Sequence, residues 1–245
     1  MAPTGARDST QVDAGVRRAR WWHLATFVAA VFGVGLQLWI EFDPAPNPDR
    51  PEFSTPIRLW NVLSYFTVWS NILVLVVAYL LWRDPLRRGR VFTVFRLASV
   101  VMITLTGVIY ALVLAPLWNP TGWQRVADET LHYTVPILAV VSFLVAGPRP
   151  RFSTRTLWAS VSIPLVYIAY TLIRSPFITY TQDGQTRHWY PYHFLDVDDL
   201  GYGRVLINIA GLLLLLLAVA GIFLYLDRKL PERPIRSPAI SPAPP

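Results

Sequence analysis

Six long apolar runs are the feature of this sequence that most limits the folds open to it. About 20 consecutive apolar residues are needed for one helix to cross the hydrocarbon core of a bilayer. Soluble domains carry about 25% charged residues, whereas this 245-residue chain has 15% charged and 53% hydrophobic residues. The sequence therefore predicts an all-α integral membrane protein, a bundle of six transmembrane helices.

The expected spans take up most of the chain and leave no room for a second domain. A polar N-terminal tail, residues 1–20, shows no helical pattern and precedes a six-helix membrane domain over residues 21–226. Residues 227–245 are rich in proline and are expected to form a disordered tail. The spans are predicted at about 21–40, 60–82, 91–117, 123–146, 156–173 and 203–226.

The distribution of basic residues predicts how the chain is oriented. If it crosses the membrane six times, both termini lie on one side, and 16 of the 22 basic residues fall on that side. Only 6 fall on the other side, together with most of the acidic loop residues. Because short loops rich in Arg and Lys stay in the cytoplasm, we expect a cell-membrane protein with both termini cytoplasmic.

Several common kinds of site are absent from the sequence. There is no cysteine, which excludes disulfides, thiolate nucleophiles and cysteine metal sites. The chain also lacks a GxSxG nucleophile elbow, a P-loop and a GxGxxG dinucleotide motif. Its net charge of +7 comes from arginines that flank the spans and does not indicate nucleic acid. We expect no cofactor and no nucleic-acid partner, and the oligomeric state stays open.

Each span has one polar side chain at about the same expected depth below the outer membrane surface. Trp and Tyr mark the interfaces, and counting about 1.5 Å per helical residue from them places Thr67, Tyr110, His132 and Asn208 roughly 9–13 Å deep. Gln37 and Tyr170 fall at similar depths, although the ends of their helices are less clearly marked. Such a layer predicts a polar pocket that opens outwards and is closed towards the cytoplasm.

His132 is the most unusual member of this layer, because ionisable side chains inside a membrane are usually functional. Asp128 lies four residues earlier on the same helix face, where its carboxylate can orient the imidazole. The alternative is a histidine that is simply solvated near the start of its helix. Tyr110 has a similar alternative, as an aromatic side chain that reaches the interface.

Thr67 stands out because of its polar neighbours, although a threonine in a membrane helix usually bonds a carbonyl of its own helix. Ser64, Thr67 and Asn71 are spaced three and four residues apart, so we expect them on one face of the second span. That face suits a polar site or a polar helix–helix seam. Arg204 and Asn208 share a face of the sixth span, which suits carboxylate binding or anchoring at the interface.

The longest outer loop, residues 176–202, combines His and Asp with several aromatic residues. We interpret it mainly as a lid over the pocket, because long loops in compact folds often act as lids. A divalent metal site is the alternative. No spacing in the loop matches HExxH or a zinc pattern, so we assign no metal ligands.

Three short segments give the chain a resemblance to a known family. Over about residues 20–226 it resembles the six-span androgen-induced-gene / androgen-dependent TFPI-regulating protein family, and especially the bacterial branch of predicted six-transmembrane proteins. The segments are Tyr65-Phe66-Thr67-Val68-Trp69-Ser70-Asn71, Leu131-His132-Tyr133-Thr134-Val135-Pro136 and Tyr190-Pro191-Tyr192-His193-Phe194-Leu195-Asp196-Val197.

The resemblance implies an atypical threonine hydrolase, since the animal members cleave fatty acid esters of hydroxy fatty acids with an intramembrane Thr and His. Carried onto this chain, these are Thr67 as nucleophile and His132 as its base, an arrangement that hydroxyl nucleophiles require. Membrane lipids or fatty acid esters are then the expected partners. Candidates to stabilise the oxyanion or to hold a free carboxylate are Asn71, Tyr110, Asn208 and Arg204.

Two hypotheses without catalysis stay open beside the lipid-ester hydrolase. The first is a lipid-binding or lipid-transport protein that uses the same pocket, and the second is a structural membrane scaffold. The scaffold hypothesis places Thr67 and His132 on different faces. Catalysis requires their side chains to lie within about 7 Å, the reach of a direct or one-water contact.

Overall fold

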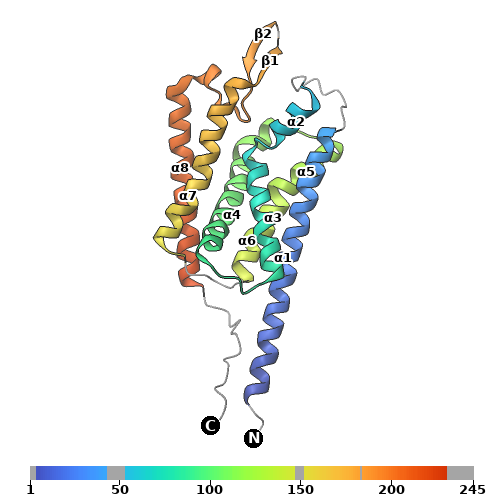
Figure 1. Ribbon diagram of the computed structural model, residues 1–245, viewed down its shortest axis with the longest axis vertical. Coiled ribbons are helices and arrows are strands. Elements are labelled where there is room, and N and C mark those ends of the chain that lie inside the picture. The colour runs from blue at the N-terminus through green and yellow to red at the C-terminus, as the bar shows by residue number, and fades with distance from the viewer. Residues whose placement is uncertain (1–3, 43–52, 147–151, 183, 231–245) are drawn as a thin grey trace.

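The computed structural model describes residues 4–42, 53–146, 152–182 and 184–230. In this part of the chain, six helices are long and apolar enough to cross a membrane. They form an all-α bundle (Figure 1), which confirms the predicted fold class. Most of the tail that we expect to be disordered, residues 231–245, lies outside the described residues.

The spans consist of α1 (Thr4–Phe42), α3 (Phe66–Arg83), α4 (Arg90–Ile109), α5 (Gly122–Glu129) with α6 (Val135–Val145), α7 (Thr154–Arg174) and α8 (Val197–Lys229). The π turns η1 (Tyr110–Leu114) and η3 (Thr130–Thr134) extend α4 and join α5 to α6. The remaining elements are α2 (Thr55–Val62), the antiparallel strands β1 (Thr179–Gln182) and β2 (Gln185–His188), and the 3₁₀ turns η2 (Ala115–Leu117), η4 (Ser175–Phe177) and η5 (His193–Leu195).

Helix α4 is the central helix of the bundle, because it contacts α3, α6, α7 and α8. Helix α1 packs along α3 and α6 on one side, and α7 with α8 form the other side (Figure 1). The largest apolar cluster lies where α4, α6, α7 and α8 meet, around Leu97, Phe143 and Phe223. The start of α1 and the end of α8 lie at the same end of the bundle, as six crossings require (Figure 1).

Helix α1 is longer than the first predicted span. It begins at Thr4, so the prediction that residues 1–20 lack regular structure is wrong from Thr4 onwards. No proline occurs between Thr4 and Phe42, and therefore nothing in the sequence stops the helix from continuing past its apolar part. The part with membrane-like hydropathy is Ala14–Phe42.

The second predicted span, 60–82, is not one continuous helix. Helix α2 ends at Val62, and α3 begins at Phe66 after a short non-helical turn. Side chains donate hydrogen bonds to the carbonyls of this turn and of the last turn of α2. In a bilayer, every such backbone group needs a hydrogen-bond partner within the protein. Ser64 Oγ donates to the Trp60 carbonyl at 2.7 Å, Trp69 Nε1 to the Leu63 carbonyl at 2.8 Å, and Tyr167 Oη to the Ser64 carbonyl at 3.0 Å.

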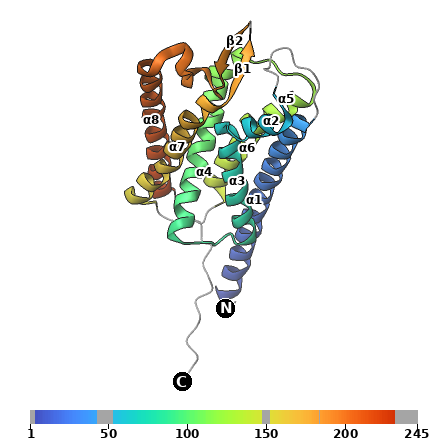
Figure 2. The ribbon, with the colours of Figure 1, turned by 45° about the horizontal axis from the view of Figure 1, so that its top comes forward.

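The outer loop folds into a β-hairpin followed by the start of α8 (Figure 2). Asp196 caps α8 by accepting from the Asp198 and Asp199 amides at 2.9 and 3.2 Å. The helix then kinks at Gly201, whose φ of 69° lies in the left-handed region that glycine tolerates.

Candidate active site

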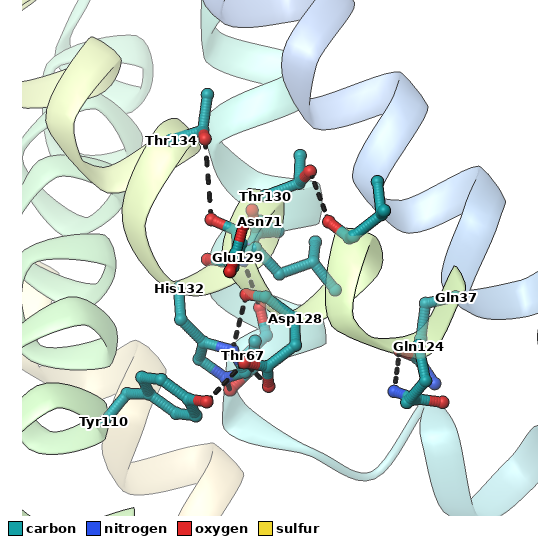
Figure 3. Close-up of polar contacts among 12 residues, drawn as sticks. Gln37, Thr67, Asn71, Tyr110, Gln124, Asp128, Glu129, Thr130, His132 and Thr134 are labelled. Atoms are coloured by element: carbon teal, nitrogen blue, oxygen red, sulfur yellow. Dashed lines mark hydrogen bonds and ion pairs between the residues drawn. The ribbon is translucent and has the colours of Figure 1, made fainter. Parts of the chain in front are cut away.

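Thr67 and His132 meet near the end of the bundle that carries the β-hairpin. Thr67 is the second residue of α3, and its Oγ1 lies 3.1 Å from His132 Nε2 on the π turn η3 (Figure 3). This distance is a direct hydrogen bond and lies well inside the limit that we set for catalysis. Thr67 is 8% exposed and the His132 side chain 13% exposed, so the pair lies just below the molecular surface.

The other face of the imidazole is fixed by Asp128 and Tyr110. His132 Nδ1 lies 3.0 Å from the Asp128 carbonyl oxygen and 3.2 Å from its Oδ1, so this nitrogen carries the proton. Nε2 is then free to accept from Thr67. Tyr110 donates to Asp128 Oδ2, and its ring stacks on the imidazole with centroids 3.8 Å apart (Figure 3). Hydroxyl, imidazole and carboxylate therefore form a chain like that of a catalytic triad.

Tyr110 and His132 both lie in π turns, which occur frequently at functional sites. Each π turn is followed by a proline, Pro116 or Pro136. In a regular helix, a proline ring clashes with the carbonyl four residues earlier, and the wider π turn relieves this clash. The prolines thus explain why the helices widen at these two places. The Tyr110 and His132 rings stack on each other there.

Close helix packing brings the two π turns together. A Cβ on Gly107, one turn before Tyr110, would meet the His132 carbonyl oxygen at 3.2 Å. A Cβ on Gly33 of α1 would meet Leu131 at 2.9 Å on the opposite side. Small residues of this kind let membrane helices approach closely. These two glycines let η3 pack closely between α1 and α4, which places His132 next to Tyr110.

Asn71 and Ser70 fix the first turn of α3. Asn71 Nδ2 donates to the Thr67 carbonyl at 2.8 Å and to the Leu131 carbonyl at 3.2 Å, so it ties α3 to η3. Ser70 Oγ donates to the Thr67 carbonyl at 2.9 Å and pairs with Thr106 Oγ1 at 2.8 Å. These contacts assign Asn71 a positioning role, because both of its amide hydrogens are already used.

Tyr192, from the loop before α8, contacts the backbone of Thr67. The Thr67 amide donates to Tyr192 Oη at 3.4 Å. The Tyr192 ring stacks on Phe194 and meets Tyr65 edge-on, with centroids 5.0 and 5.7 Å away. Burial raises the pKa of Tyr192 to about 12, so its hydroxyl keeps its proton at neutral pH. It can therefore donate a hydrogen bond to a substrate oxygen beside Thr67.

The remaining residues of the polar layer, and the other predicted site residues, lie away from the Thr67–His132 pair. Ser64 is in the turn between α2 and α3, where its Oγ pairs with Tyr170 Oη at 2.9 Å. Gln37 accepts from Gln124 at 3.2 Å, and Asn208 donates to the Phe194 carbonyl at 2.9 Å. Arg204 is exposed on α8. Of the six layer residues, Thr67, Tyr110 and His132 come together, whereas Gln37, Tyr170 and Asn208 bond to other parts of the chain.

Sequence reasoning missed two features. Tyr192 was considered only as part of a lid, and nothing in its segment indicates contact with α3. A second polar cluster lies in the other half of the bundle, where His23 Nδ1 pairs with Ser142 Oγ at 2.9 Å beside buried Arg96, around a cavity of about 40 Å³. The ionisable His23 within a span was the signal that could have identified it.

The histidines of the loop before α8 lie next to aspartates. His188 Nδ1 lies 2.8 Å from Asp198 Oδ2, and His193 Nδ1 lies 3.8 Å from Asp199 Oδ2. Within the described ranges, no group of three or more His, Asp or Glu side chains is placed to hold a metal ion. The loop residues therefore act on one another, and they attach the hairpin to the first turn of α8.

Comparisons with protein-family models, with curated proteins and with solved structures find no match to this chain. The site itself consists of a buried hydroxyl–imidazole–carboxylate chain in a protein with six apolar helices long enough to cross a membrane.

Proposed function

We propose that this protein is an intramembrane hydrolase of lipid esters, with Thr67 as the nucleophile and His132 as the general base. The observation that carries the proposal is the 3.1 Å separation of Thr67 Oγ1 and His132 Nε2, with Asp128 on the other side of the imidazole. A secondary hydroxyl needs an adjacent base of this kind to become nucleophilic. The resemblance to the androgen-induced-gene family supports fatty acid esters as the substrate class.

The proposed reaction proceeds in two balanced steps. Thr67 Oγ attacks the ester carbonyl carbon while His132 Nε2 takes the hydroxyl proton, and His132 then passes this proton to the leaving alcohol. Water then attacks the acyl-threonine while His132 takes one of its protons, and His132 passes this proton to Thr67 Oγ as the bond to the acyl carbon breaks and the fatty acid is released. Asp128 stabilises the imidazolium that forms in each step.

Tyr192 is our candidate for stabilising the oxyanion. Of the donors that the sequence suggested, Asn71, Asn208 and Tyr110 already donate to carbonyl or carboxylate oxygens of the protein. Tyr192 instead lies beside the nucleophile, where its hydroxyl accepts from the Thr67 amide, and we propose that it donates its proton to a substrate oxygen when substrate is bound. A donor preorganised beside the nucleophile is the arrangement that stabilises a tetrahedral intermediate.

Apolar surroundings and the charge distribution suggest how substrate reaches the site. We propose that lipid esters enter laterally between the apolar helices, and that water reaches the acyl-threonine from the end of the bundle that carries the β-hairpin. We propose that this end faces the outside of the cell, following the excess of basic residues at the opposite end. A fluorescent protein fused after Leu230 should then fluoresce in the cytoplasm, whereas alkaline phosphatase inserted at Gly184 should be active outside.

Hydrolysis of a fluorogenic long-chain ester, 4-methylumbelliferyl palmitate, by the purified protein in detergent tests the proposal. Thr67→Ala and His132→Ala should each lower turnover by at least about 10³-fold, the scale of losing one member of a catalytic unit. Thr67→Ser should stay active, because it keeps a hydroxyl at the same place. A fluorophosphonate probe should label Oγ1 of Thr67 in the wild type and fail to label Thr67→Ala.

Thr104→Ala is the matched control, because the Thr104 hydroxyl donates only within its own helix, to the Val100 carbonyl at 2.7 Å. It should hydrolyse the ester at the wild-type rate. Wild-type turnover in Thr67→Ala or His132→Ala would reject the assigned roles. A lipid that co-purifies and is released unaltered, with no probe labelling of the wild type, would favour the lipid-binding alternative.

A further inference from the structure

A long groove runs along the bundle between α3, α4 and α7. Its volume is about 980 Å³, at the upper end of the range for small-molecule sites. Apolar side chains line its middle part, including Trp69, Ile72 and Val76 of α3 and Phe95 of α4. Three of these are exposed at the surface of the bundle, Ile72 at 37%, Val76 at 44% and Phe95 at 43%, so the groove opens sideways to the surrounding lipid.

The groove is separate from the Thr67–His132 pair. Neither residue lines it, and the α3 residues that do, such as Ile72 and Val76, belong to a different face from Thr67 and Asn71. Helix α3 thus presents its polar first-turn face to η3 and its apolar face to the groove. A function of the groove can therefore be tested independently of hydrolysis.

The groove has a strongly basic end. Arg87, Arg88 and Arg90, in the connection between α3 and α4, line this end and are exposed. The Arg87 guanidinium lies 5.6 Å from the Phe92 ring centroid, and Phe92 also lines the groove, which holds Arg87 at the entrance. Among the described residues, no Asp or Glu lines the groove. Asp84, the one acid in this connection, accepts instead from the Leu86 amide at 3.0 Å.

The dimensions of the apolar part match one leaflet of a bilayer. Trp69 and Leu80 both line the groove and are eleven residues apart on α3, or about 16 Å along the helix axis. Half of the hydrocarbon core of a bilayer is about 15 Å thick. An acyl chain that starts at the arginines and follows α3 would therefore end close to Trp69.

We propose that this groove binds one anionic phospholipid, with its phosphate on Arg87, Arg88 and Arg90 and its acyl chains along α3 and α4. Basic pockets between membrane helices on the predicted cytoplasmic side bind anionic headgroups, and the absence of an acid from the lining leaves these cations for the lipid. A second copy of the chain would bring its own arginines to the same level, where like charges repel. A neutral lipid would leave the arginines without an anion.

Native mass spectrometry of the full-length protein in neutral detergent tests the proposal with phosphatidylglycerol and phosphatidylcholine of identical acyl chains. One phosphatidylglycerol should bind in preference to phosphatidylcholine. The triple variant Arg87→Gln/Arg88→Gln/Arg90→Gln should weaken its binding by roughly 100-fold, at about fivefold for each arginine. Val76→Trp, which fills the groove at an exposed position, should reduce binding without a change in charge.

The control is the triple variant Arg155→Gln/Arg228→Gln/Lys229→Gln, which removes three exposed cations from the same end of the bundle but outside the groove. It should bind phosphatidylglycerol like the wild type. Equal binding of both lipids, equal losses in the two triple variants, binding of glycerol phosphate alone, or a dimer that Val76→Trp dissociates would each overturn the proposal. Hydrolysis of the palmitate ester should be the same in all these variants.

Discussion

At the scale of single residues, Asp128 carries two of the contacts that hold His132. Its carbonyl and its Oδ1 both face His132 Nδ1, at 3.0 and 3.2 Å, and its Oδ2 accepts from Tyr110. We expect Asp128→Asn to lower kcat by roughly 10²–10⁴-fold, because a neutral amide does not stabilise the imidazolium as the carboxylate does. KM should change little. Steady-state kinetics on the palmitate ester measure both quantities.

Glu129→Gln is the control for Asp128→Asn. Glu129 is the adjacent carboxylate, and it forms a surface salt bridge with Arg125 at 2.8 Å. Exposed pairs of this kind contribute only about 0.2–1 kcal/mol to stability. Glu129→Gln should therefore keep the wild-type kcat, and equal effects of the two substitutions would contradict an orienting role for Asp128.

Tyr192 allows a second test at the same scale. Tyr192→Phe removes the hydroxyl that we assign to the oxyanion and keeps the ring that packs on Phe194 and Tyr65. The expected result is a kcat lower by about 10²–10³-fold, the usual effect of losing one oxyanion donor. Tyr190→Phe, in the same segment, should have no such effect. A change in KM with an unchanged kcat would show that Tyr192 only binds substrate.

These residues also show which parts of the site a sequence can predict. Thr67 and His132 were identified because a polar or ionisable side chain in an apolar span is costly and therefore informative. Asp128 followed from its spacing of four residues on a helix. Tyr192 could not be predicted, because the path of the loop after α7 depends on contacts with residues more than 100 positions away.

At the scale of elements, the π turns decide how Tyr110 and His132 face each other. We predict that Pro136→Ala lowers kcat while the melting temperature stays the same or rises. Alanine favours a regular helix by about 3 kcal/mol over proline in a helix interior, and a regular helix would rotate His132 away from Thr67. Enzyme kinetics and thermal unfolding monitored by circular dichroism measure the two effects.

The matched control is Pro164→Ala, at the proline inside α7, which lies outside the π turns. This variant should retain the wild-type kcat. If Pro136→Ala also retains it, the π turn does not position His132. Neither π turn was predicted, because apolar periodicity alone does not separate a π turn from the α-helix around it.

The break between α2 and α3 could not be predicted from the sequence either, for a different reason. Residues 63–65 contain neither Gly nor Pro, so local sequence gives no signal to stop a helix there. The turn exists because distant side chains satisfy its backbone, above all Tyr167 of α7, which donates to the Ser64 carbonyl at 3.0 Å. Element positions in the bundle were otherwise predictable, since long apolar runs must cross the membrane.

At the scale of the whole molecule, Arg174 joins the outer loop to the helices. It is 5% exposed, and its guanidinium lies 4.9 Å from the Trp60 ring and 5.1 Å from the Trp189 ring while it donates to Asn61 Oδ1. Trp189 belongs to the loop that carries Tyr192, and Tyr65 meets Trp189 edge-on with centroids 5.7 Å apart. Arg174 thus connects the loop that carries Tyr192 to α2.

We therefore predict that Arg174→Gln loosens the outer loop and lowers kcat without altering the six helices. Two cation–π contacts and one hydrogen bond contribute about 2–4 kcal/mol together, which would appear as faster hydrogen exchange in residues 185–195. Arg187→Gln, which removes an exposed 3.6 Å pair with Asp199, should change exchange there much less. Unchanged exchange in Arg174→Gln would mean that the contacts of His188 and His193 with aspartates hold the loop. Tyr192 would then reach Thr67 independently of Arg174.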